Sequence, residues 1–153
     1  MHDLAIRNAE ICDGTGVATY AGEVALTDGV ISAIGSDVGL AGKEINAQGA
    51  VVAPGIIDNH THYDAQITWD AFATPSVGLG VTTLLMGNCG FTLAPCREEE
   101  ADMVFRSLER AEDLSRDAML AGIDWSWETF PEYLDAIDKL PKGINYAGYI
   151  GHS

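Results

Sequence analysis

The sequence predicts an α/β protein in which a small β unit precedes the strands of a parallel sheet. The β unit is indicated by alternating apolar residues, without a helical period, over residues 1–50. Apolar runs then occur at residues 51–57, 81–86 and 144–150, as in strands that are buried on both faces. Helical patterns lie between the second and third runs, and repeated strand–helix–strand units imply a parallel sheet.

The β unit is predicted to be a small antiparallel sheet. Apolar residues alternate at residues 4–6 and 24–26, which places one face of each strand on a core. Asp28-Gly29 then separates the second strand from the run 30–35. A two-residue Asp-Gly loop favours a hairpin because both central positions need positive φ.

The second region is predicted to begin at residue 51. Pro54 is unfavourable inside a paired strand, so the first strand proper begins at Gly55. Thr129 and Glu132 form a capping box, which predicts a second helix that ends before Pro141. The first helix is expected over residues 98–120, with Val104, Leu108, Ala111 and Ala118 on its apolar stripe.

Composition indicates a globular protein, which we expect in the cytoplasm. The chain has 153 residues, 47% of them hydrophobic, and 8 basic against 23 acidic residues give a net charge of −15. Such an acidic excess argues against nucleic-acid and anionic-membrane partners, because phosphate binding needs clustered Lys and Arg. The N-terminus lacks signal-peptide features, and three cysteines are too few for a disulfide framework.

The length indicates the front portion of a longer protein. Residues 51–153 hold about three strands, whereas a (β/α)8 barrel needs about 250 residues. The sequence also stops directly after an apolar strand, at residues 151–153. We therefore expect residues 1–153 to be inactive and poorly folded in isolation, since an open sheet edge promotes aggregation.

Two histidines follow the strand that is predicted to begin at Gly55. His60 and His62 are two residues apart, so along a strand both imidazoles project from one face. Two imidazoles held in this way can ligate one metal ion, typically Zn²⁺. The alternative is a pair of polar residues in a turn. The position after a parallel strand favours the metal site, because α/β proteins build sites there.

Cys89 follows the second strand, between Gly87 and Gly90. A thiolate here is a candidate metal ligand, and coordination would deprotonate it. The alternative is a small buried hydrophobe, which free cysteine usually is. Cys12 and Cys96 have no comparable surroundings in the sequence.

Three further features allow two interpretations each. Asp64 orients a ligand histidine or caps the segment that follows it. His152 ends the third strand and would point to the same face as the other histidines, or is a terminal residue without a role. The aromatic segment 125–127 lines an apolar pocket or packs as a loop.

Taken together, these motifs resemble the amidohydrolase superfamily. Residues 28–35 (DGVISAIG) and 52–62 (VAPGIIDNHTH) carry that resemblance. Residues 60–66 (HTHYDAQ), 87–91 (GNCGF) and 122–130 (GIDWSWETF) are similar to the N-acyl-D-amino-acid deacylases, or D-aminoacylases. The resemblance covers essentially the whole chain.

The resemblance implies a fold, a site and an activity. Residues 1–50 would be a small β-sandwich segment, and residues 51–153 the first strands and helices of a metal-dependent (β/α)8 barrel. His60, His62 and Cys89 would bind one or two zinc ions. The implied reaction is hydrolysis of a small-molecule N-acyl-D-amino acid to a D-amino acid and a carboxylate. The general base and the remaining ligands are expected after Ser153.

Two alternatives remain at this point. A dihydropyrimidinase- or hydantoinase-like cyclic amidase would need a bridging lysine from a later strand and would have no use for Cys89. A non-catalytic fragment or binding module would use the fold only as a scaffold. Loss of metal binding and turnover on replacing Cys89 separates the deacylase from the first, and an assay on N-acyl-D-amino acids separates it from the second.

Overall fold

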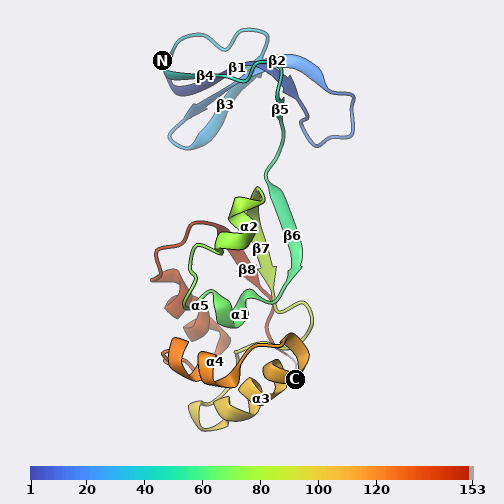
Figure 1. Cartoon of the computed structure of the whole chain (residues 1–153). Helices are drawn as coiled ribbons and strands as arrows, with labels where there is room; N and C mark the ends of the chain where they lie inside the picture. Colours follow the sequence, from blue (N-terminus) through green and yellow to red (C-terminus); the bar gives the residue numbers. More distant parts are fainter. Residues whose placement is uncertain (152–153) are drawn as a thin grey trace. The chain divides into compact units, whose positions relative to one another are not determined.

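The computed structural model describes residues 1–151, so His152 lies outside the described residues. The chain divides into two compact units, with the boundary between Pro54 and Gly55 (Figure 1). The sequence-based boundary was at residue 50. The difference arises because Val51–Val52 pairs with the first strand of the first unit, so the apolar run 51–57 is shared between the two units.

The first unit is a five-stranded sheet of order β3-β2-β1-β4, with β5 also paired to β1. The first three strands are antiparallel, as predicted, but β4 and β5 run parallel to β1, so the sheet is mixed. The strands are β1 (His2–Ile11), β2 (Tyr20–Thr27), β3 (Val30–Gly35), β4 (Ala41–Asn46) and β5 (Val51–Val52).

The hairpin between β2 and β3 turns at Asp28 and Gly29, as predicted. Their φ angles are +51° and +74°, which is the backbone conformation that a two-residue hairpin loop needs. Two small apolar clusters pack on this sheet, one around Ala5 and Ala25 and the other around Ile11 and Val24. Successive strand residues point to opposite faces, which separates the clusters.

The second unit contains a three-stranded parallel sheet of order β6-β7-β8 (Figure 1). The parallel pairing confirms the prediction from the strand–helix–strand pattern. The strands are β6 (Ile56–Thr61), β7 (Val81–Met86) and β8 (Asn145–Gly148). The helices are α1 (Tyr63–Gln66), α2 (Thr74–Gly78), the 3₁₀ turn η1 (Glu98–Glu100), α3 (Ala101–Glu112), α4 (Arg116–Gly122) and α5 (Phe130–Asp138).

The ladder between β6 and β7 contains two compensating irregularities. Between Ile56 and Ile57 the partners on β7 advance by two residues, whereas the three-residue step from Asp58 to Thr61 is matched by only two residues on β7. A β-bulge of this kind places an extra residue in one strand and changes the local direction of its side chains. The bulge on β6 therefore lies immediately before and at the first histidine of the candidate site.

The helix expected over residues 98–120 is broken into α3 and α4. Asp113 adopts φ +54° after α3, and Ser115 caps α4 by accepting a hydrogen bond from the Ala118 N–H. Because of this break, the predicted stripe is wrong at Ala111 and Ala118, which are exposed. The buried residues of the two helices are Ala101, Phe105, Leu108 and Met119.

The capping box of α5 is confirmed. The Glu132 carboxylate accepts a hydrogen bond of 2.8 Å from the Thr129 backbone N–H, and the Glu132 N–H donates to the Thr129 hydroxyl at 3.4 Å. The helix ends at Asp138, before Pro141 as expected. Helices α1 and α2 are only four and five residues long, too short to give a recognisable period in the sequence.

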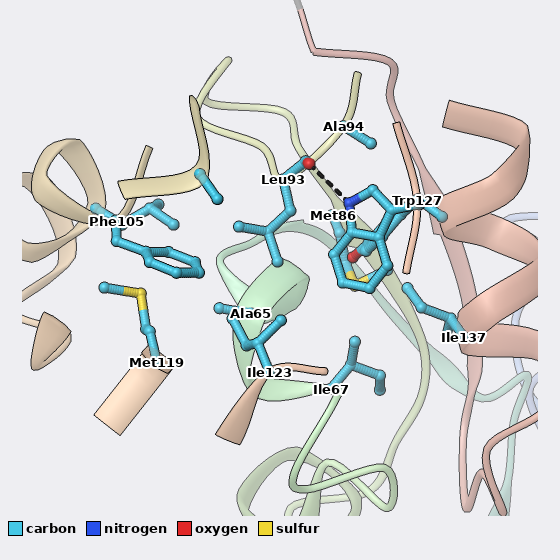
Figure 2. Packing of buried hydrophobic residues seen from close by; sticks show 13 residues of the cluster. Ala65, Ile67, Met86, Leu93, Ala94, Phe105, Met119, Ile123, Trp127 and Ile137 are labelled. Carbon is cyan, nitrogen blue, oxygen red and sulfur yellow. Dashed lines mark hydrogen bonds between the residues drawn. The ribbon is translucent and has the colours of Figure 1, made fainter. Parts of the chain in front are cut away.

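The main core of the second unit packs α1 and the segment after β7 against α3, α4 and α5 (Figure 2). Trp127 is buried there, and its indole N–H donates to the Leu93 carbonyl at 3.0 Å. The Trp125 ring lies 4.7 Å from the Trp127 ring and packs on the same cluster. The aromatic segment therefore packs as a loop, the second of its two interpretations. None of the helices among residues 1–151 is long and apolar enough to cross a membrane.

Candidate metal centre

The three predicted ligand residues meet at the carboxyl ends of two adjacent strands. His60 lies near the end of β6, His62 follows that strand directly, and Cys89 lies in the turn after β7. Their candidate ligand atoms are all within 4.8 Å of one another. The Cys89 Sγ is 3.4 Å from the His62 Nδ1, and the two imidazole rings are 5.3 Å apart. Both histidines are exposed, and Cys89 is half-buried.

This donor set fits a zinc ion. With Zn–S bonds of about 2.3 Å and Zn–N bonds of about 2.1 Å, two ligand atoms on one ion lie at most about 4.4 Å apart. Small rotations of exposed side chains bring the outermost pair, within 4.8 Å here, into that range. Imidazole and thiolate are the ligands that zinc favours over the harder Mg²⁺ and Ca²⁺. Three protein ligands leave a coordination position for another group.

The end of β6 aims both histidines to the exposed side. Thr61, between them, is buried, and its hydroxyl donates to the Leu85 carbonyl at 2.8 Å. Because neighbouring residues of a strand point to opposite faces, anchoring Thr61 in the interior directs His60 away from it. The local sequence thus orients the first histidine through the residue next to it.

The turn that carries Cys89 depends on Gly87. Its φ is +79°, and a Cβ there would lie 2.8 Å from the Tyr149 carbonyl oxygen and 2.7 Å from the Thr92 side chain. The turn is closed by a hydrogen bond of 3.0 Å from the Gly90 N–H to the Gly87 carbonyl. The Asn88 side chain donates to the Asn59 carbonyl at 2.9 Å, which links the turn to β6. Glycine is therefore required where the sequence places it.

Glu112 is part of the site, and sequence reasoning missed it. It is the last residue of α3, and its carboxylate oxygen lies 2.6 Å from the His62 Nδ1. The Glu112 side chain is only 13% exposed, whereas the His62 side chain is 38% exposed. No local pattern marks this glutamate, because it lies 50 positions after His62 and the contact depends on how α3 packs.

Asp64 holds the turn after β7 instead of a histidine. It is buried, and its carboxyl group accepts hydrogen bonds from the backbone N–H groups of Asp64 and Gly87. Burial raises the pKa of this carboxyl to about 7, helped by the nearby charge of Glu112 and opposed by the two N–H groups. Among the described residues its Oδ2 has no hydrogen-bond partner. Tyr133 donates to the Asp64 carbonyl at 2.8 Å, which ties α5 to this segment.

The other two cysteines are not members of this cluster. Cys12 belongs to the first unit. The Cys96 Sγ donates to the Arg97 carbonyl at 3.3 Å, and burial raises the pKa of its thiol, which disfavours the thiolate that a metal would need.

Comparison with known proteins identifies the family. The model of a family described as the amidohydrolase family matches residues 43–153. The chain belongs to the amidohydrolase family. That match includes every residue of the candidate site in this amidohydrolase and begins before its second unit.

Named relatives are similar to this amidohydrolase along almost its whole length. The D-aminoacylase of Alcaligenes xylosoxydans xylosoxydans is 33% identical over 153 residues, which cover 99% of this chain and 29% of the relative. A solved D-aminoacylase described by its binuclear metal centre is 30% identical, with a TM-score of 0.79, covering 99% of this chain and 30% of that one.

A further solved structure is the N-acyl-D-glutamate deacylase of Bordetella bronchiseptica, complexed with zinc and a phosphonate inhibitor that mimics the tetrahedral intermediate. It is 29% identical with a TM-score of 0.75, and again 99% of this amidohydrolase matches 30% of that chain. The mixed α/β fold thus matches amidohydrolase structures. The chain spans about three tenths of the length of these relatives.

Proposed function

We propose that the protein hydrolyses N-acyl-D-amino acids to a D-amino acid and a carboxylate, with zinc held by His60, His62 and Cys89. The observation that carries the proposal is the convergence of the two imidazoles and the thiolate at one end of the parallel sheet, within 4.8 Å. It is supported by similarity to D-aminoacylase and N-acyl-D-glutamate deacylase over 99% of the chain.

In this proposal three of the described residues would hold the ion. His60 and His62 contribute neutral imidazole nitrogens, and Cys89 contributes a thiolate from the turn that Gly87 shapes. When bound, zinc supplies Lewis-acid polarisation of the amide carbonyl and makes water a stronger acid. The three residues act as ligands and not as acid–base groups, so the proton carrier for the leaving amine is a different residue.

The proposal also includes the architecture. Residues 55–151 would be the first three strands and their helices of a (β/α)8 barrel, whose sites lie at the carboxyl ends of the strands. The first unit would be part of a small β-sandwich. The three donors would hold one or two ions.

The test is an assay of the full-length protein with N-acetyl-D-methionine and its L enantiomer. We expect release of the D-amino acid, loss of turnover after removal of metal with a strong chelator, and recovery on adding Zn²⁺. Full turnover in a rigorously metal-free preparation would contradict the mechanism. Absence of any turnover by the zinc-loaded protein would favour a non-catalytic role for the scaffold.

The competing activity is opening of a cyclic amide. It predicts turnover of a hydantoin or dihydropyrimidine substrate, and metal binding that survives loss of the Cys89 thiol. We expect neither, because the thiol and both imidazoles offer ligand atoms within 4.8 Å of one another at the same strand ends.

A further inference from the structure

We propose that Glu112 is a positioning residue that holds the proton of His62 on Nδ1, so that His62 binds the metal through Nε2. This inference rests on the proposed function and concerns how the site is prepared before the ion arrives. It is carried by the 2.6 Å contact between the Glu112 carboxylate and the His62 Nδ1.

Two acceptors lie near that nitrogen, and the carboxylate is the stronger. The Cys89 Sγ, 3.4 Å from Nδ1, is a weak acceptor because it is sulfur, whereas the carboxylate lies at the length of a charge-assisted hydrogen bond. The ring nitrogen that carries the proton is set by the hydrogen bond it makes, which leaves the opposite nitrogen as the metal ligand. Glu112 therefore selects Nε2.

The alternative is that Nδ1 itself binds the ion. Nδ1 would then have to lose its proton and could no longer donate to Glu112, leaving a carboxylate that is 13% exposed without this partner. Leaving such a group unpaired costs more than the bond itself contributes. The same contact thus opposes one coordination mode and favours the other.

Glu112 is held in place by the packing of α3. Phe105 and Leu108 on this helix are buried in the main core, and Arg116 of α4 forms an ion pair with Asp102 in the first turn of α3. The carboxylate is therefore presented by an element that the core immobilises, while His62 lies at the more exposed junction between β6 and α1. An ordered acceptor can orient an exposed ring.

The experiment measures zinc affinity of the full-length protein by competition with a chromophoric chelator. Glu112→Met removes the acceptor at similar length, and Glu112→Gln keeps an acceptor oxygen without charge; both residues are good helix formers. We expect Glu112→Met to weaken zinc binding about 10–100-fold, the usual effect of removing a hydrogen-bond partner of a ligand histidine. The loss of zinc affinity in Glu112→Gln should be clearly smaller. The matched control is Glu109→Gln, which makes the same charge change one turn earlier on α3.

Two further measurements separate this role from a structural one. The melting temperature of the metal-free variants should match that of the Glu109→Gln control, and the thiolate absorption of Co²⁺-loaded protein should persist while its ligand-field bands shift in Glu112→Met. Wild-type affinity in both Glu112 variants, while His62→Ala loses binding, would overturn the inference and leave the proposed function intact. An equal loss of zinc affinity in the two Glu112 variants would show that Glu112 acts through its charge and does not position His62, which would also overturn the inference. Wild-type binding in His60→Ala, His62→Ala and Cys89→Ala alike would overturn both proposals.

Discussion

The two ends of the parallel sheet use polar side chains differently. At the amino ends, the Thr82 hydroxyl donates to the Ile56 carbonyl at 3.3 Å and the Asn145 amide donates to the Thr82 carbonyl at 3.2 Å. Both side chains thus form hydrogen bonds that link neighbouring strands. At the carboxyl ends, the Thr61 and Asn88 side chains also link the strands, but His60 is exposed, Cys89 is half-buried, and their candidate ligand atoms lie within 4.8 Å of each other. The carboxyl ends are therefore the part of the sheet where donor side chains remain available to bind an ion.

The hydrophobic clusters that pack near the two ends of the sheet also differ in size. The cluster near the amino ends is small and consists of Ala73, Leu84 and Ile144. The main core lies beside the carboxyl ends, because it includes Met86 at the end of β7 and Ala65 just after the histidines. Burial of apolar area immobilises the segments that carry the donors. The main core therefore supports the backbone segments on which the donor side chains lie.

The largest effect should come from Cys89→Ala, which removes a donor from the carboxyl end. We expect loss of tight zinc binding and at least a 100-fold drop in turnover, because two imidazoles alone leave the ion weakly held. Zinc content after gel filtration and initial rates measure both. Cys96→Ala is the matched control and should change neither. If the Cys89→Ala variant kept its zinc, Cys89 would not be a metal ligand, and the proposed chemical difference between the two sheet ends would be wrong.

A pair of glycine variants compares the two ends directly. A Cβ at Gly55 would lie 2.0 Å from the Thr82 hydroxyl, and one at Gly87 would lie 2.8 Å from the Tyr149 carbonyl. Each alanine variant should cost about 1–3 kcal/mol of unfolding free energy by overpacking or backbone strain. Urea unfolding measures this cost.

The two glycine variants should differ in zinc affinity. Gly87→Ala should weaken zinc binding because it displaces the turn that carries Cys89, and Gly55→Ala should leave zinc binding unchanged. If Gly55→Ala weakened zinc binding as much, the ends would be coupled through the strands and the comparison would fail.

Tyr133→Phe tests the support of the carboxyl end from α5. The hydroxyl is buried and donates to the Asp64 carbonyl at 2.8 Å, so its removal leaves that carbonyl unpaired. We expect a loss of about 1–2 kcal/mol in unfolding free energy. Tyr149→Phe, at a side chain that is half exposed, is the control and should be near neutral.

The smallest effect concerns the pH dependence of the α5 cap. Hydrogen bonds from the Thr129 and Glu128 N–H groups hold the pKa of Glu132 below its usual 4.5. The unfolded carboxyl therefore takes up protons first as pH falls, so this stabilisation is present above pH 4.5 and is lost through the depressed folded pKa. The melting-temperature advantage of wild type over Glu132→Gln should shrink on acidification. If this difference in melting temperature did not change with pH, it would arise from packing of the Glu132 side chain and not from its charge.

Local chemistry made much of this molecule predictable. The Asp28-Gly29 hairpin, the Thr129 capping box and the strand at 81–86 each depend on neighbouring residues, and each is found. The approach of His60 to Cys89 was also predictable, because parallel strands bring their carboxyl ends to one edge. Such inferences need the order of elements and not their packing.

The missed features depend on tertiary context. The break at Asp113 replaces a continuous helix because the chain turns there to pack α4. Val51–Val52 is apolar like a barrel strand, but its partner is β1, which no local signal identifies. Glu112 reaches His62 only because α3 packs beside the strand ends. Sequence alone specifies none of these partners.

The bulge on β6 has a consequence for recognising related chains. Side chains of a strand alternate, so which face a residue occupies depends on whether an odd or even number of residues precedes it. The extra residue between Asp58 and Thr61 changes that parity just before His62. If the same residues alternated regularly, without the bulge, Asp58 and Thr61 would lie on opposite faces and the two histidines would exchange faces with Thr61. A related chain therefore needs the bulge as well as the letters H-x-H to present both imidazoles as this chain does.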